Sequence, residues 1–404
     1  MISVGVDVSQ GKSTICILKP YGEILKSPYD VAHTESSLKA LADELCCLSK
    51  HDEVRVIMEA TGIYHFPILN YLQQQGFFVA VVNPLSMKKY INISLRQGKT
   101  DKIDSIKIAN YGIDNWYHLL NYQPQHERYT ELHSLGRQYL NYTSMKIKAK
   151  VNLTNILEKT MPGIKQLFPS RSDFGIQNKV YLVVERYWHF DNIKCMRRNR
   201  FVNSFVKWSS KVGIYKSEAK ANALYSLAAE AITTLPAGFP STKMLVLEAV
   251  RILREIEFSI ASILAQMQTL ASSLPEFRIL TDMPGIGNIL AARLIAETGD
   301  IRRFRNANAL IAYAGLDSPP YQSGAFSASK RHISKRGSPS LRKTGYEIIN
   351  SIRKLKPDTD NAVYIYTLKK ESEGKPLKVA KIAGLNKFLR IYYARVKESY
   401  GCSN

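Results

Sequence analysis

Two aspartates that stand three residues apart, Asp101 and Asp104, have the spacing in this chain that best suits chemistry. They open a segment, residues 106–117, whose apolar residues recur at helical spacing. Because residues i and i+3 share one helix face, both carboxylates can point at one spot. A structural interpretation is also open: Asp101 caps the helix, Asp104 holds its third position, and the helix dipole favours both charges.

Two further acids, Asp7 and Glu59, end short apolar runs that are typical of buried strands. An unpaired carboxylate at such a point is costly to bury, although strand-end acids often serve only solubility. Four carboxylates at one edge would repel one another unless divalent cations lay between them, and hard oxygen ligands suit Mg²⁺ or Mn²⁺. Two such ions can clamp the attacking and leaving oxygens of a phosphodiester.

The elements that must position these acids come in the order strand, strand, strand, helix, strand, helix, strand, helix. The expected strands are residues 2–8, 13–19, 23–27, 54–58 and 77–82, and the expected helices are residues 34–48, 64–75 and one that opens at 101. Hairpins followed by βαβ crossovers predict a mixed sheet with helices on its faces, and ligand sites in such sheets form at the carboxyl ends of strands. This order of strands and acids looks like the ribonuclease-H-like fold, in its RuvC-like resolvase branch.

Positive charge is the strongest global signal, with a net charge of +22. Residues 1–120 hold 12 Lys/Arg and 12 Asp/Glu, whereas residues 276–404 hold 23 Lys/Arg and 11 Asp/Glu. A neutral first part followed by basic parts indicates that the later parts bind a polyanion such as nucleic acid, and a merely soluble basic surface is the alternative.

Neither a membrane protein nor a disulfide-stabilised protein is indicated. The sequence has no apolar run of membrane-spanning length and no leader pattern, since it begins at once as a strand. Its 5 cysteines form an odd set without a C-x-x-C pair, so a disulfide framework or a zinc site is not expected. We therefore expect a cytoplasmic protein.

The middle of the chain combines two long amphipathic helices, residues 126–159 and 241–272, with a less legible insert, residues 164–240. The two helices predict an antiparallel pair or a coiled coil between chains. In the insert, arginines at 197, 198 and 200 stand close to Lys207 and Trp208, a mixture that nucleic-acid surfaces use. A small helical insert with Trp208 in its core is the other interpretation; we expect a core position for Trp208 and a nucleic-acid contact for the arginines.

The C-terminal part holds a turn, Pro284-Gly285-Ile286-Gly287, between two apolar helical segments. This pattern is typical of a helix-hairpin-helix, in which Gly285 and Gly287 let backbone amides hold a nucleic-acid phosphate; an ordinary turn between helices is the alternative.

A serine further on, Ser323, is followed by glycine and lies beside a cluster of cations without an acid: Lys330, Arg331, Lys335, Arg336, Arg342 and Lys343. Such a serine could attack phosphorus while the cations neutralise developing charge. No general base is evident from the spacing, and most loop serines are structural.

Several short motifs occur together in one order along the chain. They are Gly5-Val6-Asp7, Met58-Glu59-Ala60-Thr61-Gly62, Lys99-Thr100-Asp101-Lys102-Ile103-Asp104, Pro284-Gly285-Ile286-Gly287, Ala314-Gly315-Leu316, Gln322-Ser323-Gly324 and Ile333-Ser334-Lys335-Arg336-Gly337. In these motifs the chain resembles the DEDD transposases of the insertion sequence 110 family. The resemblance covers roughly residues 1–120 and 276–345.

The resemblance implies a bacterial or archaeal, nucleoid-associated transposase. It implies a RuvC-like Mg²⁺ site at Asp7, Glu59, Asp101 and Asp104, and a serine at 323 that forms a phosphoserine intermediate with DNA. It also implies donor and target DNA as partners, homodimers or homotetramers with a shared active site, and, for some members, guidance by a noncoding bridge RNA.

We therefore expect a RuvC-like catalytic domain (residues 1–120), a helical and coiled-coil region (121–275) and a mainly helical C-terminal transposase domain (276–404). The expected function is metal- and serine-dependent DNA strand exchange that moves an insertion sequence. Two alternatives remain open: a metal-dependent junction endonuclease that hydrolyses DNA, with Ser323 structural, and a non-catalytic nucleic-acid-binding protein.

Overall fold

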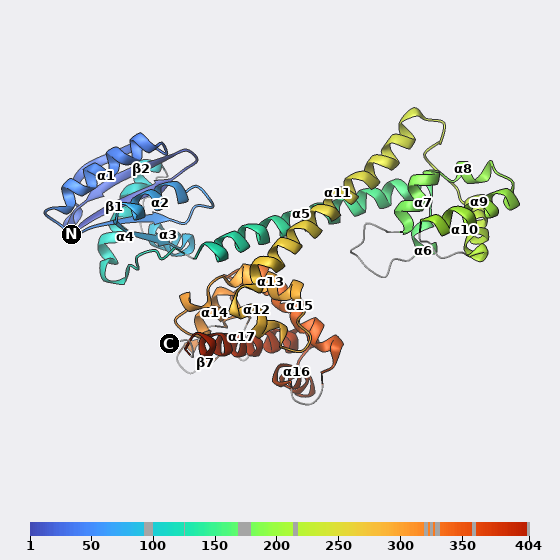
Figure 1. Cartoon of the computed structure of the whole chain (residues 1–404). Coiled ribbons are helices and arrows are strands. Elements are labelled where there is room, and N and C mark those ends of the chain that lie inside the picture. Colours follow the sequence, from blue (N-terminus) through green and yellow to red (C-terminus); the bar gives the residue numbers. More distant parts are fainter. Residues whose placement is uncertain are drawn as a thin grey trace. The chain divides into compact units, whose positions relative to one another are not determined.

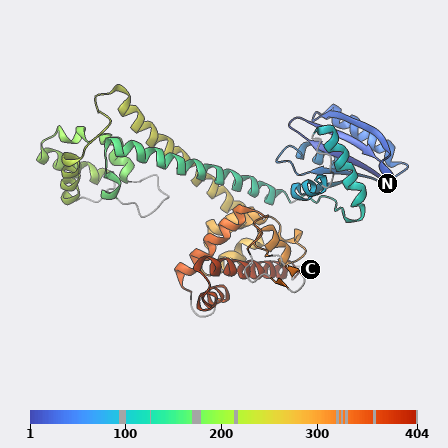
Figure 2. The ribbon, with the colours of Figure 1, turned by 180° about the vertical axis from the view of Figure 1, so that it is seen from behind.

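The computed structural model describes residues 1–92, 100–124, 126–168, 179–212, 217–318, 322–323, 326–327, 332–357 and 361–401. The chain divides into two compact units, residues 1–124 and 125–404, and each is described by itself. The first is an α/β unit and the second is mainly helical (Figures 1 and 2). No helix among the described residues has the length and apolar character needed to cross a membrane. The predicted division at residues 120 and 275 stays a prediction.

A mixed sheet forms the centre of the first unit. Its strands are β1 (Ile2–Val8), β2 (Lys12–Leu18), β3 (Ile24–Ala32), β4 (Val54–Glu59) and β5 (Phe78–Val82), in the order β3-β2-β1-β4-β5. β2 pairs antiparallel with both β1 and β3, whereas β4 pairs parallel with both β1 and β5. This order and this mixture of directions confirm the predicted ribonuclease-H-like fold.

Helices cover both faces of the sheet (Figure 1). Helices α1 (Glu35–Ser49) and α2 (Phe66–Gln74) pack on the face that presents Val4, Val6 and Met58. Helices α3 (Pro84–Ile91) and α4 (Asp101–Asp114) pack on the opposite face, and the short 3₁₀ helices η1 (Pro20–Gly22) and η2 (Trp116–His118) lie in connections. The sequence did not predict α3, because Asn83-Pro84 reads as the end of a strand; it is equally a helix start, with the Asn83 side chain accepting from the Leu85 amide at 2.8 Å.

Helix α4 crosses β1 at a backbone-to-backbone distance that only glycine permits. A Cβ atom on Gly5 would lie 2.2 Å from the Ser105 carbonyl oxygen and 2.3 Å from the Ala109 amide nitrogen. Nearby, the Ser3 hydroxyl donates to the Ala109 carbonyl at 2.7 Å. These contacts hold the helix that carries Asp101 and Asp104 directly against the first strand.

Replacing Gly5 by alanine should therefore destabilise the first unit. The added methyl overpacks a site bounded by backbone, so we expect a loss of about 1–3 kcal/mol in the free energy of unfolding. Denaturant-induced unfolding followed by circular dichroism measures it. Gly238→Ala is the control, because a Cβ there meets nothing within 4 Å. Equal unfolding curves for both variants would contradict the close crossing of α4 over β1.

The second unit is organised along two long helices, α5 (Glu127–Thr160) and α11 (Pro240–Ser272), which pack against each other. Leu132 shares a core with Leu264, and Leu157 shares another with Val246, so the two helices run antiparallel. A buried ion pair joins them between Lys146 Nζ and Glu257 Oε1 at 3.1 Å. The antiparallel interpretation of the two long helices is confirmed.

An insert of short helices lies between α5 and α11: α6 (Ile164–Leu167), α7 (Lys179–Tyr187), α8 (Asp191–Lys194), α9 (Arg198–Lys211) and α10 (Glu218–Glu230). The helices share a core with the adjoining ends of α5 and α11. Trp208 is half-buried at the edge of this core, where it contacts Tyr187 and Phe205. The core position expected for Trp208 is thus a position at its boundary.

The remaining elements form the C-terminal part: α12 (Pro275–Thr281), α13 (Asn288–Thr298), η3 (Ile301–Arg303), α14 (Ala307–Tyr313), β6 (Gln322–Ser323), β7 (Phe326–Ser327), α15 (Pro339–Leu355), α16 (Ala362–Ser372) and α17 (Leu377–Gly401). The helices among these elements share one core with the first half of α5 and the last half of α11. The predicted mainly helical character of this part is confirmed.

Candidate functional site

The first turn of α4 differs from the predicted one in its cap. The helix begins at Asp101, and the preceding Thr100 is the cap: its Oγ1 accepts from the Ile103 amide at 3.2 Å. The predicted cap role of Asp101 is therefore wrong, and Asp104 stands at the fourth helical position rather than the third. The reason is that the extended backbone of Thr100 presents a hydroxyl acceptor one residue earlier. Capping thus uses neither carboxylate.

Asp7 and Glu59 lie side by side at the carboxyl ends of neighbouring parallel strands. Val6 pairs with Met58, so Asp7 and Glu59 are the next residues on β1 and β4. Neighbouring strands are about 4.8 Å apart, and residues in register share a face. Val6 and Met58 point into the core beneath α1 and α2, so alternation places Asp7 and Glu59 on the face covered by α4.

The direction of α4 brings its first turn to the same edge. Ala109 contacts Ser3, and Ser105 contacts Gly5, so earlier residues of α4 meet later residues of β1. The helical turn before Ser105 begins at Asp101, so the same trend places Asp101 and Asp104 at the level of Asp7 on β1. The backbone therefore brings the four predicted acids to one edge of the sheet.

A cation and a further acid, which the sequence reasoning missed, border this edge. Lys12 Nζ lies 2.6 Å from Asp30 Oδ2, and the Thr14 hydroxyl, whose residue pairs with Asp7, donates to Asp30 Oδ1 at 2.7 Å. The hydrogen bond and the charge of Asp30 raise the pKa of Lys12, with a smaller contribution from the Asp101 carboxylate. The predicted third strand ended at residue 27, so Asp30 fell outside it; the alternation of Tyr29 and Val31 was the available signal.

The four acids suit a metal site by the chemistry of their oxygen atoms but not by the grouping of their side chains. All offer hard oxygen ligands, which fit Mg²⁺ or Mn²⁺. Among the residues that the structure describes, no group of three or more His, Cys, Asp or Glu side chains is gathered closely enough to hold a metal ion. Gly98 and Lys99 of the predicted motif lie outside the described residues. The backbone therefore suits a metal site, and the metal itself stays a prediction.

Ser323 lies on a two-stranded hairpin, where it pairs with Phe326 across β6 and β7. The segments on its two sides, residues 313–318 and 332–338, are hydrogen-bonded to each other, and we call this pair of segments the loop base. Its hydrogen bonds run from the Ser334 amide to the Asp317 carbonyl (2.8 Å), from the Lys335 amide to the Gly315 carbonyl (3.0 Å), from the Ser338 amide to the Tyr313 carbonyl (2.7 Å) and from the Ser318 hydroxyl to the His332 carbonyl (3.3 Å). The two ends of the segment that contains Ser323 are thus tied to each other.

The predicted cations of this loop fall into two kinds. Arg342 Nη1 donates to the Ala314 carbonyl at 2.9 Å and to the Gly337 carbonyl at 3.1 Å, so this side chain holds the loop base together. Lys335 and Arg336 are exposed. Lys330 and Arg331 lie outside the described residues. The nucleic-acid contacts predicted for these cations stay predictions, and Arg342 has a structural role that its sequence cluster did not reveal.

The predicted glycine turn between two helices is confirmed, since it joins α12 to α13. Gly285 has a φ of +89°, and a Cβ atom there would lie 2.8 Å from Ile352 Cα on α15. Gly287 precedes α13, and a Cβ there meets nothing within 4 Å. Packing therefore explains Gly285, while the α13 amides next to Gly287 are accessible for a phosphate. Lys354 on α15 borders the same turn, a cation that only the tertiary structure brings there.

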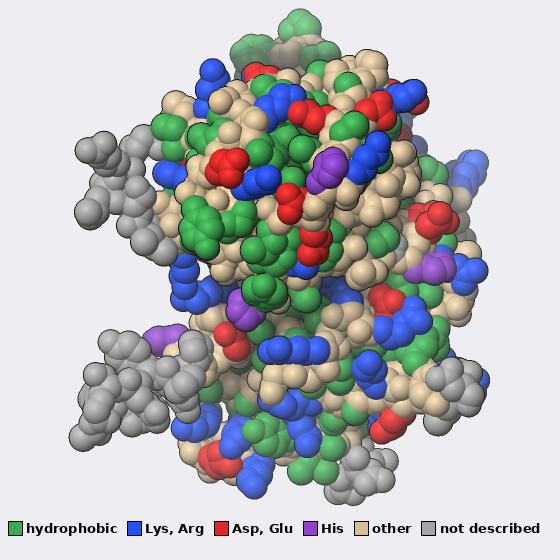
Figure 3. All heavy atoms as spheres, turned by 90° about the vertical axis from the view of Figure 1, so that its left-hand side faces the viewer, with side chains coloured by type: hydrophobic (Ala, Val, Ile, Leu, Met, Phe, Trp, Pro, Cys, Tyr) green, Lys and Arg blue, Asp and Glu red, His purple; other side chains and the backbone are tan. Residues whose placement is uncertain are grey.

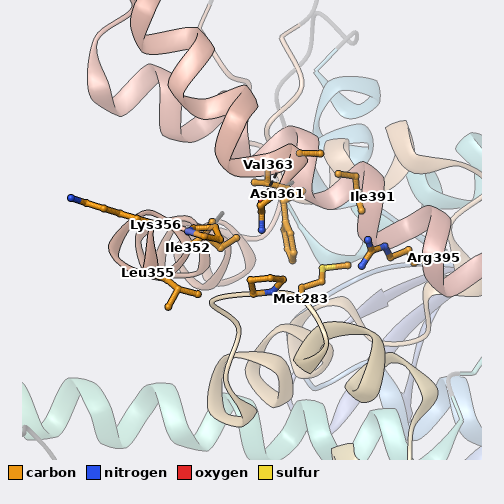
Figure 4. A pocket seen from close by; sticks show the side chains of 12 residues that line it. Met283, Ile352, Leu355, Lys356, Asn361, Val363, Ile391 and Arg395 are labelled. Carbon is orange, nitrogen blue, oxygen red and sulfur yellow. Dashed lines mark hydrogen bonds between the residues drawn. The ribbon is translucent and has the colours of Figure 1, made fainter. Parts of the chain in front are cut away.

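A pocket of about 560 Å³ lies on the other side of this turn (Figure 4). Met283, Ile352, Val363 and Ile391 give it apolar walls. The Asn361 side chain uses its oxygen to cap α16, accepting from the Tyr364 amide at 2.9 Å. Lys356 and Arg395 also line the pocket, so its walls combine apolar side chains with two cations.

Two models of known protein families match the chain. A family model of DEDD transposases of the IS110 type, described as "Transposase", matches residues 4–162, and a second, "Transposase IS116/IS110/IS902 family", matches residues 277–364. The chain belongs to the IS110 family of transposases. The four acids fall in the first matched range of this transposase, and Ser323 and the glycine turn fall in the second.

Relatives are consistent with this family. The transposase is 24% identical over 323 residues to "Insertion element IS116 uncharacterized 44.8 kDa protein" of Streptomyces clavuligerus, a match that covers 80% of this chain and 77% of the relative. It is 22% identical over 342 residues to "Insertion element IS110 uncharacterized 43.6 kDa protein" of Streptomyces coelicolor, covering 85% and 82%. Family membership makes the chain a DNA-processing enzyme.

Solved structures were compared as well. Thermus thermophilus RuvC in complex with a Holliday junction substrate is 11% identical with a TM-score of 0.23, and the match covers 30% of this chain and 99% of that one. A further structure of Thermus thermophilus RuvC gives the same identity and TM-score.

Proposed function

We propose that this transposase exchanges DNA strands through two cooperating groups, the four acids of the first unit and Ser323 of the second. The observation that supports it most is the convergence of Asp7, Glu59 and the first turn of α4 on one sheet edge. Acids that gather at the carboxyl ends of strands in a mixed sheet are typical of a ligand site.

Asp7, Glu59, Asp101 and Asp104 would hold the divalent ion, Mg²⁺ or Mn²⁺. When bound, such an ion would stabilise the charge that develops on a scissile phosphate. The protein's part is to fix the acids: Gly5 holds α4 against β1, and Thr100 caps the helix so that both aspartates stay available. Lys12, which feels the charge of Asp101, offers a cation beside the phosphate position.

Ser323 would supply the nucleophile. Its Oγ attacks phosphorus and loses its proton to solvent, an Oγ–P bond forms, and the bond from phosphorus to the leaving sugar oxygen breaks as that oxygen takes up a proton. The reverse attack by a sugar hydroxyl on the phosphoserine rejoins the strand to a new end and restores the serine. The exposed Lys335 and Arg336 near the loop base would neutralise the phosphate during both steps.

Donor and target DNA would be held by the basic second unit. The amides beside Gly287, the turn that Gly285 shapes, and Lys354 form one phosphate position. Figure 3 shows Lys and Arg side chains spread over one face of the molecule, interspersed with Asp and Glu. A net charge of +22 also suits a second polyanion, and we include a noncoding bridge RNA in the proposal. Sequencing the RNA that co-purifies with the protein tests this part.

Self-association is part of the proposal because apolar side chains are exposed on both long helices. They are Met145, Ile147 and Val151 on α5, and Met244, Leu245, Ile252 and Phe258 on α11. Apolar side chains that are exposed on an antiparallel helix pair offer area for a protein interface, and a second copy of the chain, as a dimer or tetramer, is the occupant that we propose.

Divalent ions should stabilise the full-length transposase. An ion that binds only the folded state adds about 2.7 kcal/mol at one hundred times its Kd, and we expect the melting temperature to rise with Mg²⁺ or Mn²⁺ concentration. Asp7→Asn should remove most of this rise. The control is Glu35→Gln, which removes one exposed carboxylate from α1 on the opposite face. An equal rise in both variants would favour the non-catalytic alternative, in which the acids bind no metal.

A further inference from the structure

We propose that the insert between α5 and α11 carries its own binding site for a nucleic-acid backbone. The site is the α9 stripe, which we define as Arg197, Arg200, Lys207 and Lys211. It lies between residues 163 and 276, the stretch that neither family model matches. The inference therefore goes beyond the proposed strand-exchange function and does not depend on the four acids or Ser323.

The sequence concentrates positive charge at this point. From Asn192 to Ser217 the chain contains seven Lys/Arg residues and no Asp or Glu. A run of like charges is destabilising for a solvated helix unless a partner of opposite charge binds it, since neighbouring cations three or four residues apart repel one another. The absence of acids in this run is therefore a cost that a polyanion would relieve.

Helix α9 separates its core face from its charged face. Phe201, Val202 and Phe205 are buried in the core of the insert. Arg200, Lys207 and Lys211 are exposed, and their spacings of seven and four residues place them along one side of the helix. From Arg200 to Lys211 the stripe is on the order of 16 Å long, which corresponds to about five base-pair steps of a duplex.

The stripe cations are not used by the fold. Within the described part of the chain, no carboxylate forms an ion pair with Arg197, Arg200, Lys207 or Lys211. Arg198 is different, because its Nε donates to Asn222 Oδ1 at 3.0 Å and its Nη2 to the Ser226 hydroxyl at 3.1 Å. Arg198 thus has a structural role, whereas the four cations of the stripe face solvent.

The start of α9 adds a concave surface to the stripe. A hollow of about 1110 Å³ is lined by Arg197, Arg198, Arg200 and Ser204. Arg197 is the cap residue and forms no side-chain capping bond, so the first amides of the 14-residue helix need another acceptor. Phosphate oxygens satisfy such amides and are favoured by the helix dipole.

An aromatic side chain and a further cation flank the stripe. The Arg186 guanidinium lies 5.0 Å from the centre of the Trp208 ring, and its Nη2 donates to the Ser204 hydroxyl at 3.4 Å. Cations with an interleaved tryptophan match the surfaces that hold nucleic-acid backbones. An acidic protein would be attracted by the charge but would not require the hollow at the helix start, so we assign the stripe to a phosphodiester backbone of DNA or RNA.

The test compares two variants of the full-length protein that lose the same charge. Arg200→Ala/Lys207→Ala alters the stripe, and Lys39→Ala/Lys50→Ala alters exposed lysines of the first unit. Binding is measured with a random-sequence DNA duplex and with an RNA hairpin at several salt concentrations. Each lost phosphate contact lowers the slope of log affinity against log salt by about 0.9, so the stripe variant should lose about 1.8 on at least one probe. The control should keep the full slope.

The choice of probe separates the two backbones. Loss on the RNA hairpin alone assigns the stripe to RNA, loss on the duplex alone assigns it to DNA, and loss on both assigns it to either backbone. An unchanged slope on both probes, or an equal loss in the control, would overturn the inference. Because Ala replaces exposed side chains, both variants should melt as the parent does, whereas Arg198→Ala should melt at a lower temperature. The readout is binding rather than cleavage, and it involves neither the four acids nor Ser323, so failure here is separable from failure of the strand-exchange proposal.

Discussion

Replacing Ser323 by alanine should abolish the covalent protein–DNA species and lower recombination by about 10⁴-fold or more, the scale on which loss of an enzyme nucleophile is felt. The reason is that the serine hydroxyl forms the bond to phosphorus, which a methyl group cannot do. DNA binding should persist, since the loop base is tied by backbone amides and by Arg342 rather than by Ser323. Denaturing electrophoresis of protein cross-linked to labelled DNA measures the adduct.

Ser327 provides the matched control. It lies on the other strand of the same hairpin and pairs with Gln322. Ser327→Ala should retain the adduct and the recombination rate. If Ser323→Ala still recombines, or if it cuts DNA as fast as the parent without an adduct, Ser323 is structural and the junction-endonuclease alternative holds.

Replacing Asp101 by asparagine should lower the rate of strand cleavage by about 10²–10³-fold, the effect of several kcal/mol of lost charge stabilisation. The fold should be retained, because Thr100 rather than Asp101 caps α4 and because removing one charge relieves repulsion among the acids. Stability in denaturant should equal or exceed that of the parent protein. Rates are measured by single-turnover cleavage with saturating DNA.

The control for this variant is Asp114→Asn, which removes a carboxylate from the last turn of the same helix. Its cleavage rate should stay close to that of the parent, and the amide oxygen can still accept the hydrogen bond from the Tyr90 hydroxyl. A similar loss in both variants would show that the charge of α4, rather than a metal ligand, is responsible.

The sheet and the convergence of its acids could be predicted because both depend on local patterns. Strand and helix periodicities were strong in residues 1–120, and the chain order of hairpins and crossovers restricts the topology to few choices. Once β1 and β4 are parallel neighbours, acids at their ends must come together, as Asp7 and Glu59 do.

Features that depend on tertiary pairing could not be predicted in this way. The pair of Lys12 and Asp30, and the position of Lys354 beside the glycine turn, join residues on different elements. Arg342 looked like its neighbours Lys335 and Arg336 in the sequence, yet it donates hydrogen bonds to two backbone carbonyls. Helices α6 and α8 of the insert, of 4 residues each, lack the length over which periodicity is informative.

The most direct test of strand exchange by these two groups is to identify the residue that carries DNA. The transposase is incubated with cleavable DNA and Mg²⁺ and denatured, the DNA and protein are digested, and the peptides are analysed by mass spectrometry. We predict a nucleotide attached to the peptide that contains Ser323, absent without divalent ions and strongly reduced in Asp101→Asn. DNA that is cut while every peptide stays unmodified, or a nucleotide on a different residue, would contradict the account.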